Sequence, residues 1–189
     1  MTTKTDTDRI EIRLAGEGGQ GMILAGIILA EAAAIHDKKN TIQTQSYGPE
    51  ARGGASKAEV IIAKGEIDYP EVISADVLVA LSQEACDKYT PSLKREGLLI
   101  LDEDKVGRVP VSHAVKVPIT RLAVETTGKA ITANSVALGV LVGLTGVVTR
   151  QAIEHALAAR APKGTEEMNL KALMAGFDAA KKVAAQRRH

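Results

Sequence analysis

The sequence predicts an α/β fold: a predominantly parallel sheet with flanking helices and a helical C-terminal part. Short apolar segments alternate with helical patterns up to about residue 120, and only helical patterns follow. A glycine-rich turn at residues 16–21 joins the first predicted strand to the first predicted helix. Aromatic residues make up 2% of the 189 residues, so Val, Ile, Leu and Ala must build the core. That composition favours a parallel sheet covered by helices.

The first half of the chain contains three predicted strands and one long predicted helix. Every second residue of segment 10–15 is apolar, the pattern of a strand with one buried face. The apolar, alanine-rich segment 22–35 predicts a helix packed on the sheet. Alternation at 40–46 and a run of branched apolar residues at 58–63 predict the next two strands.

In the second half, segment 76–81 is nearly all apolar and predicts a central strand. Ser82 is the expected N-cap of a helix that ends near Tyr89, and strands follow at 97–101 and 115–119. We expect residues 1–8 to be a flexible N-terminus and 9–189 to be a single α/β domain with a Rossmann-like sheet. Further helices are predicted at 122–126, 132–144, 149–160 and 166–186.

Composition and charge exclude several classes of function. The formal net charge is +1, Trp is absent and there is one Phe, which argues against a nucleic-acid-binding surface. The longest apolar stretch, 136–148, is interrupted by glycines and falls short of the roughly 18 residues of a membrane helix. This stretch can be buried either in the chain's own core or in a subunit interface, and the sequence leaves both alternatives open. We expect a soluble cytoplasmic protein without membrane insertion.

The chain contains a single cysteine, Cys86. It can form no disulfide within the chain. It also cannot hold an iron–sulfur cluster alone, because such clusters take about four thiolates. The helical pattern around Cys86 indicates a buried small apolar side chain rather than a reactive thiol.

The loop Gly16-Glu17-Gly18-Gly19-Gln20-Gly21 follows the first strand and opens the first helix. Its glycine spacing matches a dinucleotide-binding turn, and a helix N-terminus suits an anion. A purely structural turn is the alternative. An ordinary NAD site also needs an acidic residue ending the second strand, where Gln43-Thr44-Gln45-Ser46 stands instead. Asp37 precedes that strand, and Met22-Ile23 excludes a phosphate-loop signature.

A second loop, Tyr47-Gly48-Pro49-Glu50-Ala51-Arg52-Gly53-Gly54, follows the second strand. Pro49 fixes the backbone, and the glycines of the loop allow sharp turns, at the sheet edge where ligands of α/β proteins bind. Arg52 offers a planar fork for a carboxylate or phosphate. The alternative is an ion pair between Glu50 and Arg52 that only holds the loop's shape.

The chain shows no recognisable catalytic set or metal-binding motif. The four histidines, His36, His113, His155 and His189, lack the spacing of metal ligands. Ser82 follows a strand, but no glycine elbow surrounds it. We therefore predict neither catalytic residues nor metal ligands in this chain.

The two loops, in this order, resemble the gamma subunit of the 2-oxoacid:ferredoxin oxidoreductases. Tyr47 and Glu50 are most similar to the 2-oxoglutarate branch, and the branched-chain 2-oxoacid and pyruvate branches remain open. The resemblance spans about residues 10–159. It continues through Ile67-Asp68-Tyr69-Pro70, segment 75–81, segment 98–102, Thr132-Ala133-Asn134-Ser135 and segment 137–139.

The resemblance implies a non-redox subunit that is inactive alone. Such enzymes decarboxylate a 2-oxoacid on thiamine diphosphate, pass electrons through iron–sulfur clusters to ferredoxin and release an acyl-CoA. Thiamine diphosphate, Mg and the clusters are expected on partner subunits. A stand-alone nucleotide- or flavin-binding enzyme and a purely structural assembly module are the alternatives. By motif position, coenzyme A is expected at Gly18, Gly19, Gln20, Gly21 and Arg52, and a partner interface at Tyr47, Glu50 and Arg52.

Overall fold

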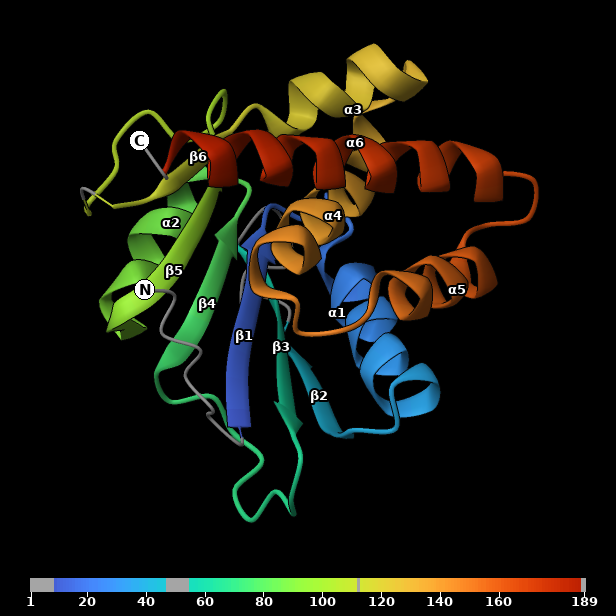
Figure 1. Ribbon diagram of the computed structural model, residues 1–189. Helices are drawn as coiled ribbons and strands as arrows, with labels where there is room; N and C mark the ends of the chain where they lie inside the picture. Colours follow the sequence, from blue (N-terminus) through green and yellow to red (C-terminus); the bar gives the residue numbers. More distant parts are fainter. Residues whose placement is uncertain (1–8, 47–54, 112, 188–189) are drawn as a thin grey trace.

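The computed structural model of the protein describes residues 9–46, 55–111 and 113–187. These residues contain a six-stranded sheet in the order β2-β3-β1-β4-β5-β6 (Figure 1). All six predicted strands are confirmed, although β5 begins four residues earlier than expected because its amino end follows directly on a short turn at Thr90–Ser92. The strands are β1 (Arg9–Gly16), β2 (Asn40–Ser46), β3 (Ser56–Ala63), β4 (Ala75–Ala80), β5 (Leu93–Asp102) and β6 (Val115–Val117).

Parallel pairing predominates, as predicted. β1 pairs in parallel with β4, from Ile12 opposite Val77 to Ala15 opposite Ala80, and β4–β5 and β5–β6 are also parallel. β3 is antiparallel to both of its neighbours, β1 and β2. Residues 47–55 join β2 to β3, and a parallel crossover needs about a dozen or more residues, so this connection returns antiparallel.

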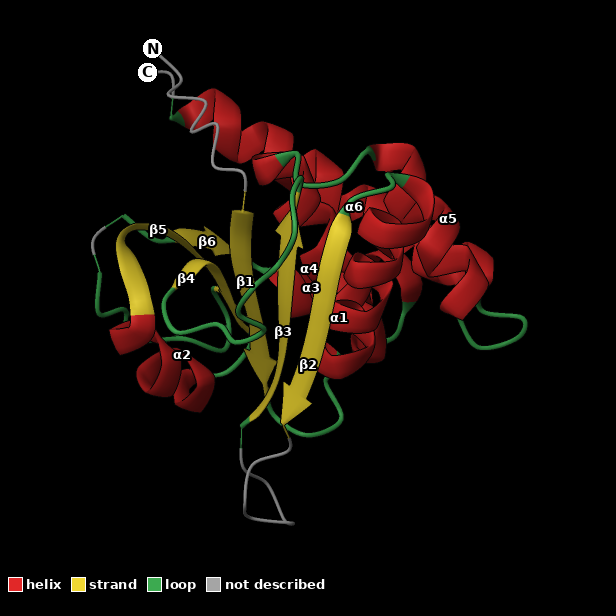
Figure 2. Cartoon of the chain, turned by 90° about the horizontal axis from the view of Figure 1, so that it is seen from below, coloured by secondary structure: helices red, strands yellow, loops and turns green. Residues whose placement is uncertain are grey.

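Helices cover both faces of the sheet, unequally. Figure 2 shows α2 on one side and the remaining helices on the other. The predicted helices are confirmed, with the first continuing as a π-helical turn, η1 (Ala32–His36). The helices are α1 (Met22–Glu31), α2 (Gln83–Tyr89), α3 (Ile119–Thr127), α4 (Ala133–Thr145), α5 (Arg150–Arg160) and α6 (Glu166–Gln186).

Local side-chain bonds set where several helices begin. Ser82 accepts from the backbone N–H of Ala85, as predicted, and Thr149 caps α5 in the same way. α3 begins three residues earlier than expected because the Asp102 carboxylate accepts from the Thr120 N–H at 3.0 Å. Thr132 precedes α4 but does not cap it, since its hydroxyl donates to the Lys129 carbonyl at 2.9 Å.

The core follows from the two-residue period of the strands. Ile12 and Leu14 of β1 point to the main helical layer, whereas Ala15 belongs to the smaller cluster under α2. α4 is buried from Ala133 to Val142 within this main layer. Segment 136–148 therefore packs largely in the chain's own core, while Gly143 and Gly146 stay exposed. In the part of the chain that is described, no helix is long and apolar enough to cross a membrane.

Candidate functional site

The glycine loop lies at the carboxyl end of β1 and leads into α1. Gly19 and Gly21 have φ values of +89° and +74°, left-handed backbone that side chains other than glycine rarely adopt. The Gln20 side chain folds back over the loop. Its amide donates to the Leu81 carbonyl at 3.1 Å, and its oxygen accepts from the Glu17 N–H at 2.7 Å. Gln20 thus ties the loop to the end of β4.

The loop leaves an open cradle at the start of α1. Gly18 and Gly19 are exposed, and apart from their chain neighbours no described residue has an atom within 4 Å of the place where a Cβ would stand at either residue. No side chain of the described residues caps α1, and the first turn of this helix carries no acidic residue. The N–H groups and the positive end of the helix dipole therefore face this opening, which is the arrangement that binds a phosphate.

Asn134 at the start of α4 supports the loop from behind. A Cβ at Gly21 would lie 2.6 Å from the Asn134 amide nitrogen, so any other residue at position 21 would displace the Asn134 amide. The Asn134 oxygen accepts from the Ser135 N–H at 2.8 Å, and the Ser135 hydroxyl donates to Asn169 of α6 at 2.9 Å. The sequence pattern alone does not indicate that Asn134 supports the glycine loop. The signal that could have indicated it is a polar residue near the start of a mostly apolar helix.

The second predicted loop, residues 47–54, lies outside the described residues, and with it Tyr47, Glu50 and Arg52. Its flanking residues are described. Ser56 lies opposite Gly16 in the β1–β3 register, and its hydroxyl donates to the Gly16 carbonyl at 3.2 Å. Ser46 lies opposite Lys57. The chain therefore enters and leaves segment 47–54 beside the glycine loop, at the carboxyl end of β1.

Asp37 is the acidic residue closest in sequence to the position where a dinucleotide site would contact the ribose. Its carboxylate binds another part of the chain. Its carboxylate accepts from the Thr149 N–H and hydroxyl, both at 2.7 Å. These bonds connect the end of η1 to the start of α5, at the amino end of β2. Asp37 therefore cannot complete a dinucleotide site at the glycine loop, in agreement with the sequence argument.

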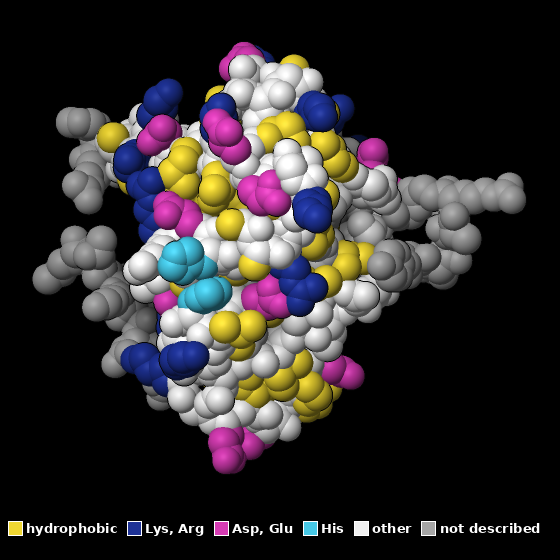
Figure 3. Space-filling view, turned by 90° about the vertical axis from the view of Figure 1, so that its right-hand side faces the viewer, with side chains coloured by type: hydrophobic (Ala, Val, Ile, Leu, Met, Phe, Trp, Pro, Cys, Tyr) yellow, Lys and Arg dark blue, Asp and Glu magenta, His cyan; other side chains and the backbone are white. Residues whose placement is uncertain are grey.

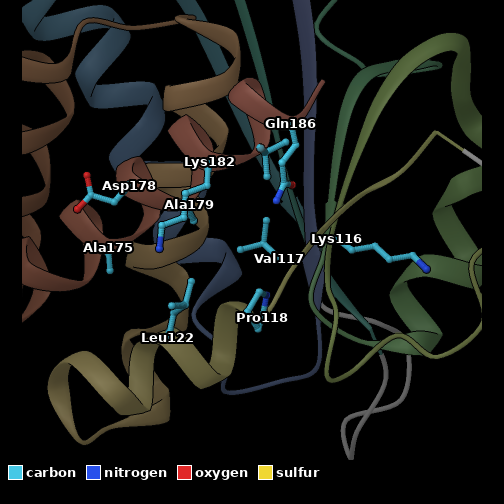
Figure 4. Close-up of a pocket in the computed structure, with 10 residues that line it drawn as sticks. Lys116, Val117, Pro118, Leu122, Ala175, Asp178, Ala179, Lys182 and Gln186 are labelled. Atoms are coloured by element: carbon cyan, nitrogen blue, oxygen red, sulfur yellow. The ribbon is translucent and has the colours of Figure 1, made fainter. Parts of the chain in front are cut away.

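An apolar groove of about 390 Å³ lies between β6, α3 and α6 (Figure 4). Val117, Pro118, Leu122 and Ala179 face it, while Lys116 extends away from the other lining residues. None of the described site residues predicted from the sequence lines this groove. It is thus separate from the glycine loop.

Cys86 is fully buried in the cluster between α2 and the sheet. Burial raises the pKa of its thiol, an effect that the nearby Thr90 hydroxyl partly offsets. Within the described ranges, no group of three or more His, Cys, Asp or Glu side chains could hold a metal ion. A buried, protonated thiol with no further cysteine in the chain does not fit an iron–sulfur cluster.

We predict that Cys86 resists modification in the folded protein. The thiolate is the reactive form, and both burial and the raised pKa disfavour it. A thiol-reactive dye at pH 8 should label less than a tenth of the chains in the time that labels free cysteine fully, and label all of them in urea. Rapid stoichiometric labelling under native conditions would contradict this prediction.

The fold and site define an α/β protein with a glycine loop that joins its first strand to its first helix. The chain belongs to the pyruvate ferredoxin/flavodoxin oxidoreductase family, which matches residues 11–179. This confirms the resemblance seen in the sequence.

Individual relatives refine the family assignment. The 2-oxoglutarate synthase subunit KorC of Methanocaldococcus jannaschii is 51% identical, covering 93% of this chain and 96% of that protein. KorC of Methanothermobacter thermautotrophicus is 50% identical, with coverage of 89% and 93%. The crystal structure of the gamma subunit of a keto/oxoacid ferredoxin oxidoreductase from Geobacter sulfurreducens is 49% identical. It covers 92% of this chain and 99% of its own, with a TM-score of 0.83. The chain is therefore similar over nearly its full length to gamma-type subunits.

Proposed function

We propose that this chain is the gamma subunit of a 2-oxoglutarate:ferredoxin oxidoreductase. That complex converts 2-oxoglutarate and coenzyme A to succinyl-CoA and CO₂ and passes the electrons to ferredoxin. The observation that carries the proposal is the 50–51% identity, over nearly the whole chain, to subunits of 2-oxoglutarate synthase. Tyr47 and Glu50 in the second loop, the residues most similar to this branch, support the same substrate.

The redox cofactors belong to partner subunits in this proposal. Cys86 does not fit a cluster, and the described residues hold no group of three or more His, Cys, Asp or Glu side chains that could hold a metal ion. One partner carries thiamine diphosphate and Mg, another carries the iron–sulfur clusters, and ferredoxin meets the assembled complex. Thiamine diphosphate supplies the decarboxylation chemistry there. This chain contributes binding and positioning, and no catalytic residue.

Coenzyme A fits the cradle of the glycine loop. Its pyrophosphate and 3′-phosphate are anions of the kind that a helix N-terminus binds. We assign the backbone N–H groups of Gly18, Gly19 and Gly21 to these phosphates, and Gln20 contributes by fixing the loop through its bonds to Glu17 and Leu81. We assign Arg52 to a further anionic group of coenzyme A. Tyr47 and Glu50, with Arg52, form the proposed contact to a partner subunit.

Co-expression with the partner subunits tests the function. The assembled complex should reduce a viologen dye with 2-oxoglutarate and coenzyme A, at kcat/KM at least about 30-fold above that for pyruvate or a branched-chain 2-oxoacid, a difference of about 2 kcal/mol. The isolated chain should show no activity with any of them. Dye reduction by the chain alone would overturn the subunit role, and a preference for pyruvate would overturn the substrate.

The coenzyme A site gives a separate prediction. Arg52→Ala removes a charge-assisted hydrogen bond worth about 1.5–3 kcal/mol, so the KM for coenzyme A should rise about 10- to 100-fold. The KM for 2-oxoglutarate should stay within about twofold. Arg95→Ala, at an exposed arginine of β5, is the matched control and should leave both constants unchanged.

A pair of variants at Gly18 tests the described part of the same site. Gly18→Asp adds a negative charge beside the start of α1, whereas Gly18→Asn adds a side chain of nearly equal size without charge. Both fit the open space there. The aspartate should raise the KM for coenzyme A several-fold above the asparagine, because it repels a bound phosphate. Equal constants for both variants, together with an unaffected Arg52→Ala complex, would remove coenzyme A from these loops.

A further inference from the structure

The fold brings together two histidines from distant parts of the chain. His36 ends η1 and His155 lies in α5. Their ring centroids are 5.3 Å apart, with the ring planes inclined at 54°. Both side chains are exposed, and Figure 3 shows histidine side chains side by side on this face of the molecule. No sequence motif indicates the pair, since the residues meet only through packing of η1 on α5.

The geometry suits two imidazoles on one metal ion. Imidazole–metal bonds of about 2.0–2.1 Å at a tetrahedral angle place the two ring centroids about 5 Å apart. The 5.3 Å separation of the His36 and His155 ring centroids is close to this value. Exposure leaves the remaining coordination positions to water.

The two elements that carry the histidines are fastened to each other on both sides of the pair. Asp37 accepts two hydrogen bonds from Thr149, as described above, at the start of α5. Toward the end of α5, the Arg160 Nε donates to both carboxylate oxygens of Glu31 at 2.9 and 2.8 Å. A metal ion would therefore meet a largely preorganised pair, which lowers the cost of binding.

The neighbouring carboxylates are already engaged. Glu31 pairs with Arg160, and Asp37 holds Thr149 and lies 3.8 Å from the Lys39 ammonium. The described residues accordingly offer two nitrogen ligands here and no third side chain. Imidazole nitrogens without carboxylates select Cu²⁺, Ni²⁺ and Zn²⁺ over Mg²⁺ and Mn²⁺.

We propose that His36 and His155 form an open, two-histidine binding site for a divalent transition-metal ion. The site lies at the opposite end of α1 and η1 from the glycine loop, about 20 Å away along the helix. It is independent of the proposed coenzyme A site. A bound ion links η1 to α5 and keeps exchangeable water ligands.

Calorimetric titration of the untagged full-length chain with Ni²⁺ and Cu²⁺ tests this site. We expect one ion per chain, Cu²⁺ tighter than Ni²⁺, and no binding of Mg²⁺. His36→Ala and His155→Ala should each weaken binding more than about tenfold, since even outer partners of metal ligands contribute about 10- to 100-fold. His113→Ala, at an exposed histidine in another part of the chain, is the matched control and should bind like the wild type.

Thermal unfolding gives a readout that does not depend on the calorimetric fit. Saturating Ni²⁺ should raise the Tm of the wild type and of His113→Ala, because an ion that binds only the folded chain stabilises it. It should leave the Tm of His36→Ala and His155→Ala unchanged. Wild-type affinity in either of these two variants, or no binding by the wild type, would overturn the proposal.

Discussion

Replacing Gly139 by alanine should destabilise the protein by about 3 kcal/mol, the upper end of the range for overpacked cores. Gly139 of α4 lies against α6, where a Cβ would stand 2.2 Å from the Leu173 carbonyl oxygen and 2.9 Å from the Gly176 Cα. These are backbone atoms, so no side-chain rotation relieves the clash. The two helices must move apart and open the main core between them.

The sign of the change makes this a sharp test. In an unobstructed helix, alanine is more favourable than glycine by about 1 kcal/mol, so a stabilised Gly139→Ala variant would show that α4 and α6 do not touch here. Urea unfolding measures the difference. Gly107→Ala, at a loop glycine whose Cβ position is open, should change the free energy of unfolding by less than about 0.5 kcal/mol.

The same contact connects stability to the proposed function. Asn134, the second residue of α4, lies against Gly21 of the glycine loop. A displaced α4 therefore disturbs the cradle as well as the core. We expect any complex that still assembles with Gly139→Ala to bind coenzyme A more weakly than the wild type.

The elements of this fold are predictable because their signals are local. Alternation in β1, the continuous apolar run of β4 and the caps at Ser82 and Thr149 each depend on a few neighbouring residues. The parallel pairing of β1 and β4 agrees with the predominantly parallel sheet that the apolar composition predicts. The antiparallel direction of β3 was missed, although the length of segment 47–55 contains the signal.

The site was predictable only in part. The glycine loop is a local strand–turn–helix feature, so its place at the carboxyl end of β1 followed from the sequence. The residues that support the loop in the tertiary structure could not be predicted, because Asn134 and Leu81 reach the loop through packing of distant segments. The contact between His36 and His155 could not be predicted from the sequence for the same reason.

The second large effect is expected at a buried ion pair on the face of the sheet opposite the main core. Arg13 and Glu59 lie opposite each other in the β1–β3 register and are 4% and 8% exposed. The Arg13 Nε donates to the Glu59 Oε1 at 2.7 Å, and the Lys57 ammonium contacts the same oxygen at 2.9 Å. Arg13 also donates to the Val72 carbonyl at 2.8 Å.

Glu59→Ala should lower the free energy of unfolding by about 3–5 kcal/mol, because it leaves the Arg13 charge buried without its partner. Urea unfolding of Glu59→Ala against the wild type measures this. Glu154→Ala removes an exposed ion pair with Arg150 and should cost only about 0.3–0.5 kcal/mol. If Glu59→Ala also lowered the free energy of unfolding by only that amount, the result would show that water reaches Arg13.

The double variant Arg13→Met with Glu59→Leu tests whether the fold requires an ion pair at these two positions or only the absence of an unpaired buried charge. Replacing a buried ion pair by apolar side chains of similar volume is often neutral or stabilising by about 1–4 kcal/mol. We therefore expect the double variant to unfold at urea concentrations close to or above those of the wild type, far above Glu59→Ala. Because β3 follows segment 47–54, its attachment to β1 also holds Ser56 of β3 opposite Gly16 of the glycine loop. A stable double variant with an unchanged KM for coenzyme A would show that this attachment needs matched side chains and not an ion pair.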